Sequence, residues 1–163
     1  TRRSSDLRVI IGEPAALILD GLLEEYGIKI ISTKGKRDKS VLGSYTDTYS
    51  IAKVHGEKCL QFIFSIISNA GWNNETNGFS TFVMRALREV WVAHPNNRTE
   101  IQEFLSKRLR QLDPALFNAN AKTKYPKRDH RAACVLYLED IVCDGLKLEK
   151  KIYIDEGKCK LVK

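Results

Sequence analysis

Apolar residues are most concentrated between Glu57 and Trp72, in the stretch EKCLQFIFSIISNAGW. Read as a helix, this stretch places Leu60, Phe64 and Ile67 on one face and further apolar side chains on both flanks. Read as a strand, it lacks a polar side. Its length, and the glycine on either side of it, favour a helix. A helix that is apolar nearly all round is buried on most sides, so we predict that it is the central helix of the core.

Helical spacing of apolar residues recurs along most of the remaining chain. It predicts further helices over residues 1–12, 14–26, 40–55, 79–94, 97–112, 114–121 and 126–145. In the helix over 79–94, Phe82 and Trp91 are expected to face the core. The pattern Asn97-x-x-Glu100 predicts a capping box at the start of the next helix. Pro126 is expected to open the last long helix and Gly145 to end it.

Extended structure is predicted only in short pieces. Residues 28–31 form one apolar extended segment. Residues 147–162 alternate in hydropathy on both sides of Asp155-Glu156-Gly157, which predicts a β-hairpin with a turn at these three residues. The expected fold is therefore mainly α: a single-domain bundle of about seven helices over 1–145, with a C-terminal β-hairpin over 146–163 packed on it.

The chain contains four widely spaced cysteines and no apolar run long enough to cross a membrane. Cys59 and Cys134 fall in apolar helical stretches, where a free thiol behaves as a small hydrophobic group. We therefore expect a reduced protein of the cytoplasm, either of a bacterial host or associated with its nucleoid, with no membrane partner. The sequence opens at Thr1 without an initiator methionine, which suggests a fragment or a processed product.

The formal net charge is +7, which permits attraction to nucleic acid. The most distinctive basic segment is KTKYPKRDHR, expected to form a loop and the first turn of a helix. Its candidate nucleic-acid contacts are Lys122, Lys124, Tyr125, Lys127, Arg128, His130 and Arg131, with Tyr125 available to stack on a base. A second, weaker basic loop over 33–39 contributes Lys34, Lys36 and Arg37. The alternative is that these side chains are simply solvated, with those of the first segment paired with Asp129 and Asp113.

Catalytic signals are few. The sequence has no H-E-x-x-H, G-x-S-x-G, phosphate-loop or C-x-x-C motif, and no metal or cofactor is expected. Asp140 and Asp144, followed by Glu156-Gly157-Lys158, are the only hint of a metal-dependent nuclease. Because D-E-G is ordinary turn chemistry, the hairpin explains these residues better, and we expect no catalytic residue.

The order of features resembles a known family. The segments are GEPAALILDGLLEEYGI, a basic loop, SVLGSYTDTYSIAKVHGEKCLQFIFSIISNAGW and LDPALFNANAK. Together they are similar to the C-terminal helical region of ParB-like proteins of phages and mobile elements, over most of residues 1–143. The motif of that family's N-terminal domain is absent, so no activity of that domain is carried over, and the C-terminal hairpin departs from the family pattern.

The resemblance implies a role near DNA. We therefore expect a DNA-binding or DNA-associated accessory domain that contacts phosphate through its basic segments. A protein-interaction or dimerisation module, as a homodimer or with another protein, is the alternative, and a metal-dependent nuclease is the third possibility.

Overall fold

The computed structural model describes residues 12–30 and 39–163. This part of the chain forms seven α-helices: α2 (Pro14–Glu25), α3 (Tyr45–His55), α4 (Glu57–Asn69), α5 (Thr81–Ala93), α6 (Arg98–Arg108), α7 (Pro114–Lys124) and α8 (His130–Leu146). Two short 3-10 helices, η1 (Trp72–Asn74) and η2 (Leu109–Gln111), and two two-stranded sheets complete it. The predicted mainly α fold with a C-terminal hairpin is confirmed. The predicted helix over 1–12 lies outside the described residues.

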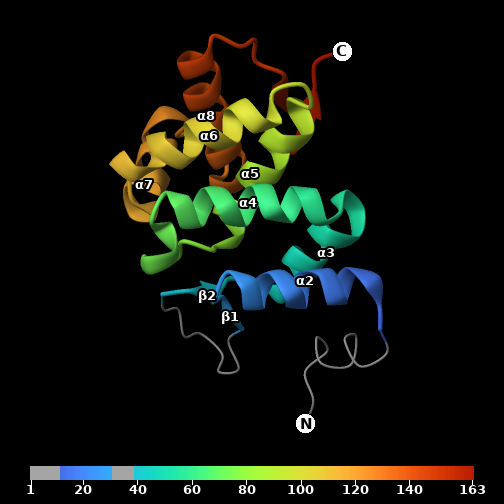
Figure 1. Cartoon of the computed structure of the whole chain (residues 1–163). Helices are drawn as coiled ribbons and strands as arrows, with labels where there is room; N and C mark the ends of the chain where they lie inside the picture. The colour runs from blue at the N-terminus through green and yellow to red at the C-terminus, as the bar shows by residue number, and fades with distance from the viewer. Residues whose placement is uncertain (1–11, 31–38) are drawn as a thin grey trace.

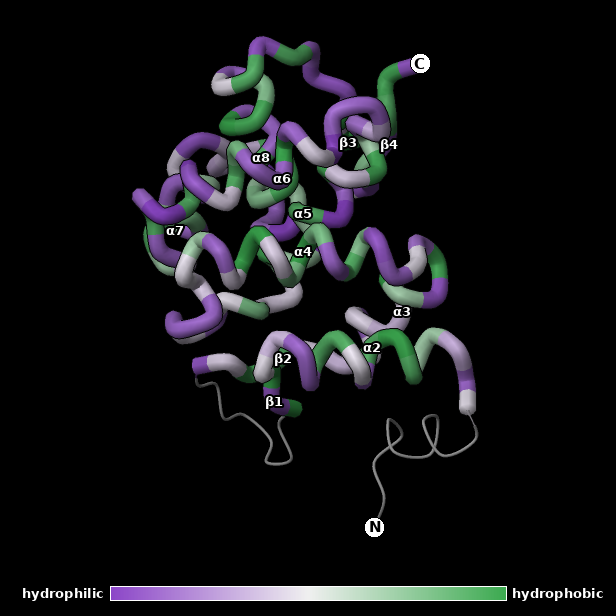
Figure 2. Tube along the Cα trace, in the orientation of Figure 1, coloured by the Kyte–Doolittle hydropathy of each residue, from purple (hydrophilic) through white to green (hydrophobic). Residues whose placement is uncertain are grey.

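Helix α4 is the centre of the core, as its apolar run predicts. It contacts α2, α3, α5 and α6, and it lies between α2 and α6 in Figure 1. Hydrophobic positions recur along both α2 and α4 in Figure 2. The ring of Phe64 is fully buried and makes edge contacts with Tyr26 and Phe79, each with ring centroids 5.8 Å apart.

The segment before α3 corrects one prediction. The helix expected from residue 40 begins at Tyr45, with the side chain of Ser44 accepting a hydrogen bond from the amide of Asp47. Residues Val41–Leu42 instead form β2, which pairs in parallel with β1 (Lys29–Ile30). The extended path continues through Gly43, whose amide donates to the Phe79 carbonyl at 2.9 Å. A Cβ at Gly43 would lie 2.8 Å from that oxygen, so only glycine fits this approach.

Helices α5 and α6 differ from expectation at their starts. Ser80 caps α5, and Phe82 in its first turn is 37% exposed rather than facing the core. Asn97 precedes α6 but makes no side-chain cap; its amide group contacts the Glu100 carboxylate at 3.4 Å instead. The predicted capping box is therefore absent.

Both ends of α8 also differ from the prediction. Pro126 lies in the preceding turn, and the helix begins at His130 because the Asp129 carboxylate accepts from the amide of Ala132 at 2.8 Å. Gly145 does not end the helix, which continues to Leu146. Gly145 instead allows a close approach of Phe104, whose ring would lie 2.1 Å from an added Cβ.

The predicted hairpin is confirmed as β3 (Ile152–Asp155) and β4 (Lys158–Leu161), paired antiparallel. Glu156 and Gly157 form its two-residue turn with φ of 51° and 74°. Positive φ at both positions is typical of a type I′ turn, so Glu156 is a turn residue as predicted. Strand β3 packs on α8, and Ile152 is buried there.

Candidate nucleic-acid interface

The basic segment KTKYPKRDHR spans the end of α7, a short turn and the start of α8. Lys122 and Lys124 belong to the last turn of α7 rather than to a loop, a position where cations suit the helix dipole. The amide of Arg128 donates to the Tyr125 carbonyl at 3.2 Å and closes the turn. The cap of Asp129 then starts α8, so two helix ends hold this segment in place.

Two of the predicted contact residues bind a buried carboxylate. The Tyr125 hydroxyl donates to the carboxylate of Asp140, and the Lys124 ammonium pairs with the same carboxylate at 2.7 Å. Lys150 reaches the other carboxylate oxygen at 2.6 Å. Asp140 is buried, and these partners explain how a buried carboxylate stays charged. Lys124 and Tyr125 therefore both make structural contacts with Asp140.

The pKa shifts of Asp140 and of its partners follow from the same contacts. Burial alone would raise the pKa of Asp140, but the hydrogen bonds from Lys124, Lys150 and Tyr125 outweigh it and lower the pKa. The pKa values of two of the partners, Tyr125 and Lys150, shift in the opposite direction. Burial, followed by the bond to Asp140, raises the pKa of Tyr125, and the bond to Asp140 raises that of Lys150.

Four of the predicted contact residues form a separate, exposed set: Lys122, Lys127, Arg128 and Arg131. Within residues 12–30 and 39–163, none of the four has a carboxylate within 4.0 Å. We call these four residues the basic turn. Their charges are available to an anion, because no carboxylate in the described part of the chain neutralises them.

Beside the basic turn lies a cavity of about 340 Å³. Lys122 and His130 line it together with Asn118, the α5 cap Ser80 and the first residue of α5, Thr81. Hydroxyl, amide and ammonium groups are all donors to phosphate oxygens, and the start of a helix carries a partial positive charge. The cavity therefore extends the basic turn with donors that suit an anion.

His130 lies beside Lys122 in the lining of this cavity. Burial, and then the charge of Lys122, lower its pKa. The Phe82 ring packs against its edge, with centroids 4.5 Å apart, and this contact explains why Phe82 points away from the core. His130 also lies 3.7 Å from the Cys134 sulfur. Burial raises the pKa of Cys134 to about 11, so this thiol is not an activated nucleophile.

One cluster of potential metal ligands exists in the described part of the chain: His94, Glu139 and Cys143, with ligand atoms within 4.8 Å of one another and all three residues buried. The Glu139 carboxylate already accepts from His94 at 2.8 Å and from the amides of Lys151 and Ile152 at 2.9 and 3.2 Å. Because these bonds occupy both oxygens, the cluster is explained as an anchor that ties the C-terminal segment to α8.

Lys34, Lys36 and Arg37, the second predicted patch, lie outside the described residues. Sequence reasoning missed Asn118, Ser80 and Thr81 beside the basic turn. Ser80 before an apolar helical run is a recognisable cap signal, but nothing local to Asn118 or Thr81 indicates that they lie near Lys122.

Comparisons with protein-family models, with curated proteins and with solved structures found no match to this chain. Among the described residues, no helix is long and apolar enough to cross a membrane.

Proposed function

We propose that this chain is a DNA-binding or DNA-associated domain that contacts backbone phosphates through the basic turn. The observation that carries the proposal is the division of the basic segment into neutralised and available charges. Lys124 is paired with a buried carboxylate, whereas Lys122, Lys127, Arg128 and Arg131 are exposed and lack acidic partners among the described residues. Available cations around a polar cavity are what phosphate binding requires.

The choice of DNA as the polyanion draws on the resemblance to ParB-like proteins of phages and plasmids. Electrostatic contact of this kind is sequence-independent and releases counterions. The proposal therefore concerns affinity and positioning, and it assigns no base-reading residue.

A salt titration tests the proposal. The logarithm of affinity for DNA should fall linearly with the logarithm of salt concentration, with a slope of about −0.7 to −0.9 for each phosphate neutralised. Replacing Lys127 and Arg128 together by alanine should weaken binding to all sequences and flatten the slope by up to about two units.

The control variant must remove the same charge without damaging the fold. Lys147 and Lys150 are unsuitable, because Lys147 has φ 57° and Lys150 pairs with buried Asp140. Lys158 and Lys163 are exposed and have no ion-pair partner among the described residues, so their double alanine variant is the matched control. An equal loss of affinity in both variants would show that DNA binding depends only on the overall positive charge and not on the basic turn.

The alternative function, a protein-interaction or dimerisation module, draws on different residues. On the hairpin, Tyr153 and Leu161 are 44% and 40% exposed on opposite faces, and Val162 after it is 53% exposed. Exposed apolar side chains of this size suit a protein partner. Absence of DNA binding even at low salt, together with a dimer in solution, would favour this alternative.

A further inference from the structure

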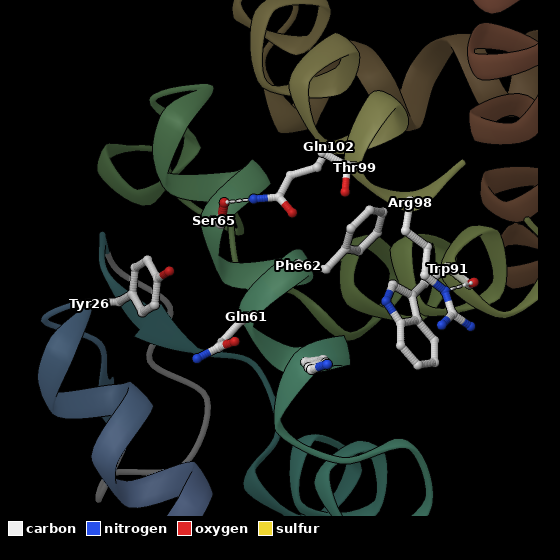
Figure 3. Close-up of a pocket in the computed structure, with 9 residues that line it drawn as sticks. Tyr26, Gln61, Phe62, Ser65, Trp91, Arg98, Thr99 and Gln102 are labelled. Carbon is white, nitrogen blue, oxygen red and sulfur yellow. Dashed lines mark hydrogen bonds between the residues drawn. The ribbon is translucent and has the colours of Figure 1, made fainter. Parts of the chain in front are cut away.

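A cleft of about 600 Å³ lies between α4 and α6, next to the ends of α2 and α5 (Figure 3). Its lining includes three aromatic side chains, Tyr26, Phe62 and Trp91, and two cations, Lys58 and Arg98. The remaining lining side chains carry amide or hydroxyl groups, and no carboxylate is among them. The cleft shares no residue with the basic turn or with the cavity beside it.

Arg98 is fixed in place at one side of this cleft. Its guanidinium carbon lies 3.3 Å from the centroid of the Trp91 ring, and its Nε donates to the Trp91 carbonyl at 2.9 Å. Figure 3 shows the guanidinium stacked on the indole with this bond drawn. Its two terminal nitrogens have no hydrogen-bond acceptor within the described ranges. A guanidinium that is already oriented loses little entropy when it binds an anion, and its fork suits phosphate or carboxylate oxygens.

The rest of the lining narrows the class of ligand. Lys58 supplies a second positive charge at the cleft, and it is exposed. Phe62 is buried and contributes apolar surface to the lining, while Tyr26 and Trp91 are half-buried. Gln102 is held by its hydrogen bond to Ser65 at 2.7 Å, and the Gln61 side chain is exposed. Flat apolar surfaces with amide groups suit a planar, polar-edged ring.

We propose that this cleft binds a nucleotide, with the phosphate held by Arg98 and Lys58 and the base placed against an aromatic side chain of the lining. The volume of the cleft exceeds the space that a phosphate ion alone needs, and the aromatic lining would be unexplained by an inorganic anion. The nucleotide is either free or part of a single strand. In the second case the cleft would add a base-stacking contact to the phosphate contacts proposed for the basic turn.

Calorimetric titration with adenosine monophosphate, with inorganic phosphate and with a short single-stranded oligonucleotide tests this assignment. The nucleotide should bind more tightly than inorganic phosphate. Arg98→Gln should weaken nucleotide binding about tenfold, as expected for the loss of one charge-assisted contact. Arg98→Lys should also weaken it, because lysine keeps the charge but loses the fork.

Lys58→Gln keeps the assignment testable if the Arg98 variants loosen Trp91, because Lys58 is exposed and its loss should leave the fold intact. It should weaken binding severalfold. The matched control is Lys107→Gln, an exposed position on α6 outside the cleft lining, which should leave binding unchanged. Equal affinity for phosphate and nucleotide would overturn the proposal, and so would nucleotide binding that is absent or insensitive to both Arg98 and Lys58.

The titration with the oligonucleotide distinguishes a free nucleotide from a single strand as the ligand. A strand that binds much more tightly than the mononucleotide, and competes with it, identifies a strand as the ligand; equal binding identifies a free nucleotide. The alanine double variant of Lys127 and Arg128 should not change the affinity for the mononucleotide. Failure of the proposed DNA function at the basic turn would therefore leave the result for the cleft intact.

Discussion

The charged residues in the middle of α8 and those around its start differ in whether the chain itself supplies their partners. In the middle of the helix, Glu139 and Asp140 are buried, and every carboxylate oxygen has a partner from the chain itself. Around its N-terminal turn, Lys127, Arg128 and Arg131 are exposed and have no acidic partner among the described residues. Buried charges without partners are too costly to persist, whereas exposed ones cost little. The comparison separates charges that build the fold from charges that are available to a ligand.

Glu139 and Asp140 differ in the type of donor that binds each carboxylate. Glu139 is bonded by an imidazole and two backbone amides, while Asp140 is bonded by two lysines and a tyrosine. Both tie the segment after α8 back onto the helix, through Lys151 and Ile152 for Glu139 and through Lys150 for Asp140. The two carboxylates therefore hold the C-terminal segment that continues into the hairpin.

The largest expected effect in this comparison comes from Glu139→Ala. The substitution leaves the His94 ring and the amides of Lys151 and Ile152 without their acceptor in a buried site. We expect it to lower the free energy of unfolding by on the order of 3–5 kcal/mol, measured by urea denaturation. Hydrogen exchange at the Ile152 amide should also become faster. Glu149→Ala is the control, because that carboxylate is 90% exposed and its one ion pair among the described residues is with Lys151 at 3.6 Å. A loss no larger than that of the control would show that Glu139 is not an anchor.

A smaller loss, about 1–2 kcal/mol near neutral pH, is expected for Asp140→Asn, because the half-exposed lysines that lose their partner can be solvated. The pKa of Asp140 is lowered in the fold, so its stabilisation is complete above the unfolded value of about 3.9 and is lost as pH falls through the folded value. The difference in unfolding free energy between the two proteins should therefore shrink when pH is lowered below about 4. A difference that stays constant in acid would contradict this account.

Substitutions at Tyr125 test whether this residue supports the fold or is available to a ligand. Tyr125→Phe removes only the hydrogen bond to Asp140 and should cost about 1 kcal/mol in unfolding free energy. Tyr125→Leu removes the ring as well and should leave DNA affinity unchanged, because the side chain serves the interior. A specific loss of DNA affinity in the leucine variant, with unchanged stability in the phenylalanine variant, would return Tyr125 to the stacking role that its sequence position suggests.

The sequence predicts well those features that depend on local pattern. The apolar run of α4, the Asp113–Pro114 start of α7 and the turn at Glu156 and Gly157 are each determined by a few neighbouring residues, and the structure confirms them. The predicted start of α8 at Pro126 was wrong. The sequence P-K-R-D-H contains two start signals, a proline suited to the first helical turn and an aspartate suited to the N-cap. The bond from the Ala132 amide to the Asp129 carboxylate decides in favour of His130 as the first helical residue.

Features that depend on distant residues could not be predicted in the same way. Lys124 and Tyr125 are sequence neighbours of the basic turn, but their partner Asp140 lies 15 or more residues further along the chain. Strands β1 and β2 are two residues each, too short to give an alternating pattern. Arg98 and Trp91 are only seven residues apart, but their stacking depends on how the turn between α5 and α6 joins the two helices. Local composition identifies which charges exist, whereas tertiary contacts decide which of them remain available.

The smallest effect on stability is expected for Lys122→Ala, within about 0.5 kcal/mol, because the side chain is exposed. Its informative consequence lies at His130, whose pKa is lowered first by burial and then by the charge of Lys122. Removing that charge should raise the pKa of His130, but not fully to the ordinary value of about 6.5, because burial remains. An NMR titration of the His130 ring measures the change. Lys127→Ala, which removes a charge outside the cavity lining, is the control and should leave this pKa unchanged. Equal shifts in both variants, or none in the first, would show that the cavity beside the basic turn is not electrostatically coupled to Lys122.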